Sequence, residues 1–316
     1  MAAKAILRAG LLLTALFAQN STAAPKSELW SYWSEHQANS SVAVNHQIWQ
    51  SLLSRFVRES DDGINRVAYG EFDEAAKAEL LEYLDAMSRI APTQLNQNEQ
   101  LAYWINLYNA QTVQVVLDHP KKKSILSMGP FFAFGPWDEP YLTIVGKPVT
   151  LNDIEHRILR PIWQDHRLHY VLNCASIGCP NLNRTAYQAD SVDQQLAQAQ
   201  IDFLQHPRAI SLTDNGRLQL TSLFDWYLID FAPDFTGLLA YLAAQRPDLA
   251  ADLSALVDEG NRKTEYVYDW DLNVVVWSAV AMGNLRREYE HIALRDHPNV
   301  TRPRGDDYHH EPPGPA

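Results

Sequence analysis

The stretch that most constrains the fold is "EQLAYWINLYNAQTVQVVL", residues 99–117, which Pro120 soon follows. At helical spacing its apolar side chains lie on nearly every side, and a helix of this kind is normally buried at the centre of a domain. Asn98 stands just before it and is the expected N-cap. The sequence therefore predicts a fold assembled around one central helix.

Polar side chains interrupt this apolar helix. Glu99, Tyr103 and Asn106 share one face, and Asn109 lies three residues further on. Buried amides must find hydrogen-bond partners. The residues either tie the helix to neighbouring loops or line a polar pocket, and in the second reading Glu99, Asn106 and Asn109 bind substrate.

The first 24 residues have the pattern of a secretory signal peptide. Lys4 and Arg8 precede an apolar run, and small residues follow, with cleavage expected near Ala23 or Ala24. The run is shorter than the roughly 20 residues that a membrane-spanning helix needs. We therefore expect an exported protein, periplasmic or secreted, without a membrane span.

Charge narrows the classes of partner. The chain carries a formal charge of -12, and removal of Lys4 and Arg8 with the signal would make it -14. An acidic protein is a poor candidate for binding nucleic acid or anionic membranes. Its nine tryptophans suit aromatic-lined clefts. The expected partner is a small molecule or peptide of unknown identity, and no cofactor or metal is predicted.

The remaining segments mix helices and strands without repeated βα units. Helical spacing recurs at 45–58, 74–90 and 190–205, whereas 141–151 and 209–221 are typical of hairpins. Such a mixture indicates the α+β class. We expect a helix-rich single domain with a small, mostly antiparallel sheet.

The chain has only two cysteines, in the segment "HYVLNCASIGCPN". Residues 168–172 are predicted to form a short buried strand, and Cys174 and Cys179 follow in a loop of small and polar residues. Three readings stay open: a disulfide, which an exported protein can form; a reactive thiol at Cys174 or Cys179; and two inert buried thiols. We expect the two cysteines to lie close enough to bond, at the mouth of a polar pocket.

A reactive thiol needs a base. His169 opens the predicted strand and His156 lies on a short helix, and either imidazole suits proton transfer near neutral pH. Along an ideal strand His169 and Cys174 would face opposite sides, so His156 is an equal candidate. Asp225 could orient the histidine and complete a Cys-His-Asp set.

Further residues could line a ligand cleft. Asn173 and Ser176 belong to the cysteine loop, whose turn residues let its backbone approach a ligand. Trp226 and Tyr227 lie between Asp225 and Asp230. These aromatic residues either contact a ligand or belong to the core.

Five spaced motifs, "AYWINLYNAQTVQVVL", "LNDIEHRILR", "RLHYVLNCASIGCPNL", "FDWYLIDF" and "YVYDWDLN", occur in this order. Together they resemble the bacterial branch of the family called domain of unknown function 547, from about residue 96 to 273. The resemblance implies that the motif residues gather around one site or one core, and it implies no reaction. By analogy alone, the fold could be similar to that of papain- or transglutaminase-type cysteine enzymes.

These observations predict the following organisation: a signal peptide (1–24), a helical lead-in (25–95), a core that resembles domain 547 (96–275), a C-terminal extension of the core (276–300) and a disordered tail (301–316).

Two functions remain open. The first is a thiol-dependent hydrolase or transferase with Cys174 or Cys179 as nucleophile. The second is a non-catalytic domain that binds a ligand or protein and whose cysteines form a structural disulfide.

Overall fold

The structure is a computed structural model that describes residues 25–131, 133–213, 216–257 and 264–275. Up to Val274 the described residues belong to one unit. The predicted signal peptide (1–24), C-terminal extension (276–300) and tail (301–316) lie outside the described residues. None of the described helices is both long enough and apolar enough to cross a membrane.

Helices dominate the chain. The α-helices are α1 (Gln47–Phe56), α2 (Glu74–Ser88), α3 (Gln97–Asp118), α4 (Arg160–Trp163), α5 (Val192–Gln205), α6 (Leu223–Trp226), α7 (Leu228–Phe231), α8 (Phe235–Gln245) and α9 (Ala250–Ala255). A π-helix, Asp153–Leu159, leads into α4. Short 3-10 helices cover Ser31–Ser34, Tyr69–Glu71, Pro92–Gln94, Ile125–Ser127, His166–Tyr170 and Pro247–Leu249.

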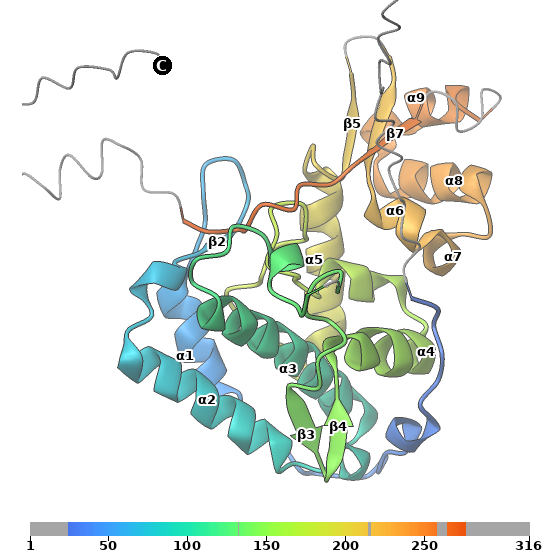
Figure 1. Ribbon diagram of the computed structural model, residues 1–316. Helices are drawn as coiled ribbons and strands as arrows, with labels where there is room; N and C mark the ends of the chain where they lie inside the picture. The colour runs from blue at the N-terminus through green and yellow to red at the C-terminus, as the bar shows by residue number, and fades with distance from the viewer. Residues whose placement is uncertain (1–24, 132, 214–215, 258–263, 276–316) are drawn as a thin grey trace, which may run out of the picture. The chain divides into compact units, whose positions relative to one another are not determined.

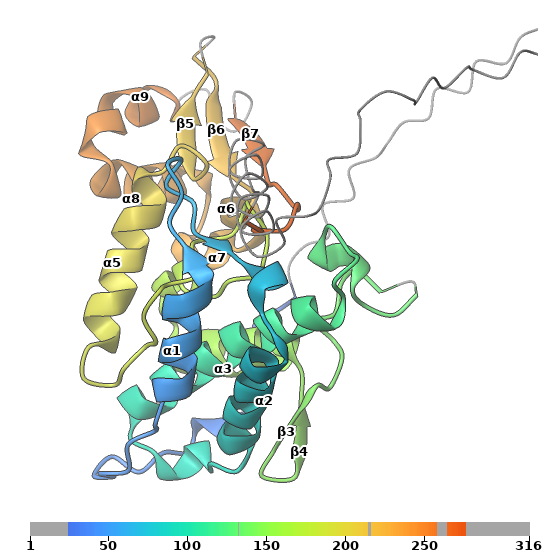
Figure 2. The same cartoon turned by 90° about the vertical axis from the view of Figure 1, so that its left-hand side faces the viewer.

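The strands of the described residues form three small sheets. β1 (Val57–Arg58) pairs with β2 (Arg66–Val67), and β3 (Leu142–Ile144) pairs with β4 (Lys147–Val149), both antiparallel. β5 (Ile210–Leu212) is antiparallel to β6 (Leu218–Thr221), which is parallel to β7 (Thr264–Val267). Sheet β5–β7 lies with α8 and α9 at the opposite end from the β3–β4 hairpin (Figures 1 and 2). The α+β class is confirmed, although the strands form three sheets instead of one.

The central helix is α3, as expected. Every residue from Glu99 to Val116 is buried, and α3 runs through the middle of α1, α2, α4 and α5 (Figure 1). Its N-cap is Asn96, whose side chain accepts a hydrogen bond from the Glu99 amide at 3.0 Å. The prediction of Asn98 as cap was wrong by two residues, because the helix begins one residue before Asn98.

The two asparagines of α3 bind backbone groups of distant loops. Asn106 pairs with both backbone groups of Tyr187, at 2.8 and 3.0 Å. Asn109 donates to the carbonyl of Val171 at 2.9 Å and accepts from the amide of Asn173 at 2.8 Å. Both amides therefore tie the helix to loops, as in the first of the two readings.

Glu99 and Tyr103 of α3 act in the same way. Glu99 accepts a hydrogen bond from the Val44 amide at 2.6 Å, and the Tyr103 hydroxyl donates to the Met87 carbonyl at 3.0 Å. These contacts join α3 to the N-terminal segment, so residues 25–95 share one hydrophobic core with it.

The strand predicted at 168–172 is absent from the described structure. This segment is instead the 3-10 helix His166–Tyr170, which the Asp165 side chain caps by accepting from the Arg167 amide. The Val171 carbonyl that follows it accepts a hydrogen bond from the Asn109 side chain instead of from a strand. The alternation of a strand therefore does not determine on which sides His169 and Cys174 lie.

Replacement of Asn106 by leucine should lower the stability of the fold. It would leave the buried amide and carbonyl of Tyr187 without partners, and each such group costs about 1–3 kcal/mol. A lower melting temperature is expected by thermal unfolding. Asn98→Leu is the matched control, because Asn98 is exposed on the same helix. Equal melting temperatures for the two variants would contradict the placement of Asn106.

Candidate functional site

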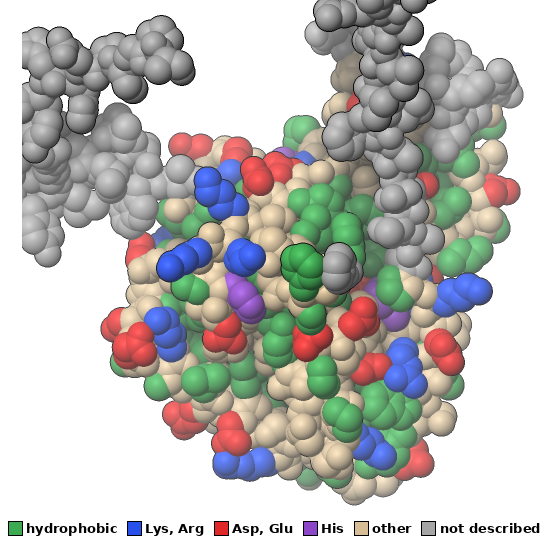
Figure 3. Space-filling model, viewed as in Figure 1, with side chains coloured by type: hydrophobic (Ala, Val, Ile, Leu, Met, Phe, Trp, Pro, Cys, Tyr) green, Lys and Arg blue, Asp and Glu red, His purple; other side chains and the backbone are tan. Residues whose placement is uncertain are grey.

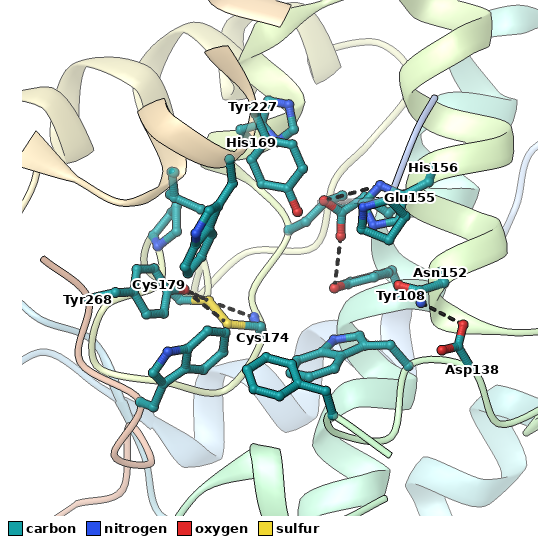
Figure 4. A pocket seen from close by; sticks show the side chains of 18 residues that line it. Tyr108, Asp138, Asn152, Glu155, His156, His169, Cys174, Cys179, Tyr227 and Tyr268 are labelled. Carbon is teal, nitrogen blue, oxygen red and sulfur yellow. Dashed lines mark hydrogen bonds and ion pairs between the residues drawn. A yellow bond between two sulfur atoms is a disulfide. The ribbon is translucent and has the colours of Figure 1, made fainter. Parts of the chain in front are cut away.

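A pocket of about 260 Å³ lies where α3, the π-helix, the cysteine loop and the segments around residues 226 and 269 meet (Figure 4). Its aromatic wall consists of Phe134, Trp137, Trp226, Tyr227, Tyr268 and Trp270. Its polar wall includes Glu155, His156 and His169. On the face shown in Figure 3, hydrophobic side chains gather near the centre and acidic side chains lie close to them.

Glu155 is the buried acid of the pocket. It lies on the π-helix, a rare conformation that often occurs at functional sites. Its carboxylate accepts from the Tyr108 hydroxyl at 3.2 Å and also from the Tyr227 hydroxyl. Burial raises the pKa values of Tyr108 and Tyr227 well above their ordinary value, so both hydroxyls keep their protons and donate.

The Glu155 carboxyl is ionised. Burial acts to raise its pKa, but the charges of His156 when protonated, His169 and Arg160, together with the Tyr227 hydroxyl, outweigh burial. The pKa of Glu155 therefore lies below its ordinary value of 4.5. The pocket holds a carboxylate at neutral pH.

His156 is neutral. The Arg160 guanidinium donates to its Nδ1 at 3.0 Å, which leaves Nε2 as the nitrogen that carries the proton. Burial lowers the pKa of His156 below its ordinary value of 6.5. At neutral pH this imidazole adds no positive charge to the pocket.

His169 is held by a carboxylate and a ring. Its Nε2 lies 2.7 Å from Oδ2 of Asp230, which also accepts from Nε of Arg160 at 2.6 Å. Tyr227 stacks on the imidazole with ring centroids 4.0 Å apart. The predicted orienting role of Asp225 is therefore filled by Asp230. Asp225 is exposed, because α6 ends and α7 begins between the two acids.

The two cysteines form a disulfide whose Cα atoms are 6.1 Å apart, so the expectation that they lie close enough to bond is confirmed. Both side chains line the pocket together with His156 and His169. Within the described structure the hydrogen-bond partners of the sulfurs are the Cys174 amide and the hydroxyls of Ser176 and Tyr268, and no histidine is among them. Neither cysteine is a free thiol.

Comparison with known proteins identifies part of the chain. The family described as "Protein of unknown function, DUF547" matches residues 92–204. This segment belongs to that family. Neither the curated proteins nor the solved structures gave a significant match. The likeness to a bacterial branch, and to papain- or transglutaminase-type folds, thus stays a prediction.

The DUF547 segment supplies α3, the π-helix and the cysteine loop, and later residues complete the pocket. Of the predicted site residues, the structure brings together the following six: His156, His169, Cys174, Cys179, Trp226 and Tyr227. The predicted substrate-binding residues Glu99, Asn106, Asn109, Asn173 and Ser176 are not among the described lining residues. Their polar groups already bond within the protein.

Sequence reasoning missed several residues that define the site. Glu155 precedes His156, and Arg160 follows one helical turn later. This spacing of an acid, a histidine and an arginine on one helix could have indicated that the three residues belong to one site. Tyr108 belongs to the apolar helix, where no local pattern distinguishes it from core residues. Tyr268 and Trp270 lie in the motif "YVYDWDLN", and their spacing in the sequence does not indicate a role in a site.

Asp230→Asn should lower stability in a pH-dependent way. Burial acts to raise the pKa of Asp230, but hydrogen bonds from His169 and Arg160 hold it below its ordinary value of 3.8. The stability it contributes is therefore complete above about pH 5 and is lost as pH falls through the lower folded-state pKa.

Thermal unfolding at a series of pH values tests this. The variant should melt below the wild type at neutral pH, and the difference should shrink as pH falls from about 5 to about 2. Asp85→Asn, which breaks an exposed pair with Arg89, should have little effect at any pH. A difference that persists unchanged in acid would refute the assignment.

Proposed function

We propose that the protein is an exported binding domain whose pocket takes a small organic cation, such as a substituted ammonium ion. The observation that carries the proposal is the charge of the lining. Two carboxylates, Glu155 and Asp138, line the pocket, and no lysine or arginine is among the described lining residues. The signal-peptide pattern and the disulfide support the exported location.

The aromatic wall suits a cation. Trp226 stacks on Trp270 with centroids 5.6 Å apart, and Tyr268 lies 4.8 and 4.6 Å from these two rings. Trp137 approaches Trp270 at 6.0 Å. Indole and phenol faces attract cations, most strongly where the site is desolvated. A cluster of such rings around a pocket is the chemistry by which proteins recognise substituted ammonium ions.

The buried carboxylate supplies the complementary charge. The side chain of Glu155 is 11% exposed, and its two tyrosine partners are neutral. Burial of an ionised group is unfavourable, and the tyrosines beside Glu155 add no opposite charge, so a cationic ligand would offset part of that cost. Arg160 is engaged elsewhere, by Asp230, His156 and the Pro25 carbonyl.

Calorimetric titration with benzyltrimethylammonium tests the proposal. The cation should bind, and its neutral isostere, in which carbon replaces nitrogen, should bind about thirtyfold more weakly, since a desolvated cation–π contact and ion pair contribute roughly 2 kcal/mol. The pKa of Glu155 lies below 4.5. Its carboxylate should therefore contribute equally to affinity at all pH values above about 5, and affinity should fall in stronger acid as the carboxylate is protonated.

Glu155→Gln should reduce affinity for the cation and leave affinity for the neutral isostere unchanged. Glu79→Gln is the control, because it removes the same charge from an exposed pair with Arg55. Equal binding of cation and isostere by the wild type would overturn the proposed ligand class.

A second candidate function is the thiol-dependent hydrolase or transferase. Its support is that Cys174 is only half-buried and lines the same pocket as His156 and His169. It needs a thiolate, and therefore reduction of the disulfide. Free-thiol titration of protein taken from its native compartment separates the two functions. A disulfide that stays intact in active protein would exclude the thiolate mechanism.

A further inference from the structure

The cysteine loop keeps its shape through contacts other than the disulfide. The Asn173 side chain donates to the Pro180 carbonyl at 2.7 Å and so joins the residues that flank the two cysteines. Its oxygen accepts from the Ala175 amide at 2.9 Å. The same loop closure is thus made twice, once by hydrogen bonds and once by the disulfide.

A second segment fixes the loop from outside. Amides of Ile177 and Gly178 donate to the carbonyls of Asp271 and Asp269, both at 2.8 Å, and the Asn273 amide donates to the Ala175 carbonyl at 3.0 Å. A disulfide that closes so short a loop contributes only about 2 kcal/mol in the chain-entropy model. The fold therefore has little need of this bond, which nevertheless lines a pocket.

The two sulfurs differ in access and in partners. Cys174 is half-buried, whereas Cys179 is 3% exposed. The Cys179 sulfur accepts from the Cys174 amide at 2.8 Å, and the Tyr268 hydroxyl lies 3.2 Å from both sulfurs. In thiol–disulfide exchange one sulfur is attacked and the other leaves as a thiolate, and a more stable thiolate leaves faster. The amide and the hydroxyl lie where they would stabilise a thiolate on Cys179.

We propose that the Cys174–Cys179 disulfide is redox-active and oxidises a small thiol that enters the pocket. The ligand thiolate attacks the Cys174 sulfur, the S–S bond breaks, and its electron pair passes to Cys179. A second ligand thiolate attacks the ligand sulfur of the mixed disulfide and releases Cys174. Two ligand thiols become one disulfide. Their two electrons and two protons pass to the protein and reduce its disulfide to two thiols. This activity does not depend on the ligand charge proposed above.

Mixed-disulfide trapping tests the direction of attack. The oxidised protein is mixed with cysteamine without oxygen, quenched in acid, alkylated and analysed by peptide mass spectrometry. Cysteamine is expected on Cys174 and the alkyl group on Cys179. Adducts shared equally between the two cysteines, or exchange no faster than in the urea-unfolded chain, would overturn the proposal.

Two further measurements separate a redox bond from a structural clip. Tyr268→Phe should slow exchange about three- to tenfold, because it removes one donor to the leaving thiolate. Tyr241→Phe is the matched control, since its hydroxyl bonds to Tyr170 instead. The reduced protein should retain its melting temperature within a few degrees. A large decrease would make the disulfide structural. Binding of the thiol-free cation to oxidised protein is unaffected by either outcome.

Discussion

The whole structure depends on satisfying the hydrogen bonds of a helix that has no exposed side. Because residues 99–116 of α3 are all buried, the two asparagines among them cannot turn to water and find their partners inside the protein. Asn109 does so by binding Val171 and Asn173, which come just before Cys174. The contact that makes burial of α3 tolerable is therefore also the contact that positions the cysteine loop. Tyr108, on the same helix, reaches Glu155.

The sequence predicted those features that hydrophobic periodicity encodes. The period of α3 and the alternation of the hairpins follow from burial of one face or of all faces, so their existence and the α+β class could be foreseen. The segment at 168–172 could not, because a short apolar run fits a buried strand and a buried 3-10 turn equally well. Its conformation depends on Asn109, a residue on another element.

The site was predictable in its residue types and less so in its pairings. Cysteine, histidine and tryptophan drew attention by themselves, and the structure gathers five such predicted residues, together with Tyr227, around one pocket. Choosing between Asp225 and Asp230 required the break between α6 and α7 to be known. Glu155 is a buried acid only because tyrosines from α3 and from the segment between α6 and α7 close over it, and no local pattern records such contacts.

The Arg160 guanidinium forms its salt bridge with Asp230, and the Glu155 carboxylate bonds to tyrosine hydroxyls instead. Arg160 pairs with Asp230 on one side of the Tyr227 ring, and its guanidinium lies 4.9 Å from that ring. Glu155 is held by hydroxyl donors, which stabilise an anion through hydrogen bonds while leaving its net charge in place. The field of the carboxylate therefore extends into the pocket, where the aromatic rings lie.

The segment from Tyr268 to Asn273 joins the two halves of the site. Its carbonyls at Asp269 and Asp271 fix the cysteine loop, while Tyr268 and Trp270, two residues apart, both line the pocket. Tyr268 contacts Cys174 across 94 residues of sequence. The match to DUF547 ends at residue 204, so the disulfide and histidines belong to the matched segment and much of the aromatic wall does not. The residues matched by the family model thus form only part of the pocket lining, and residues that follow that segment complete it.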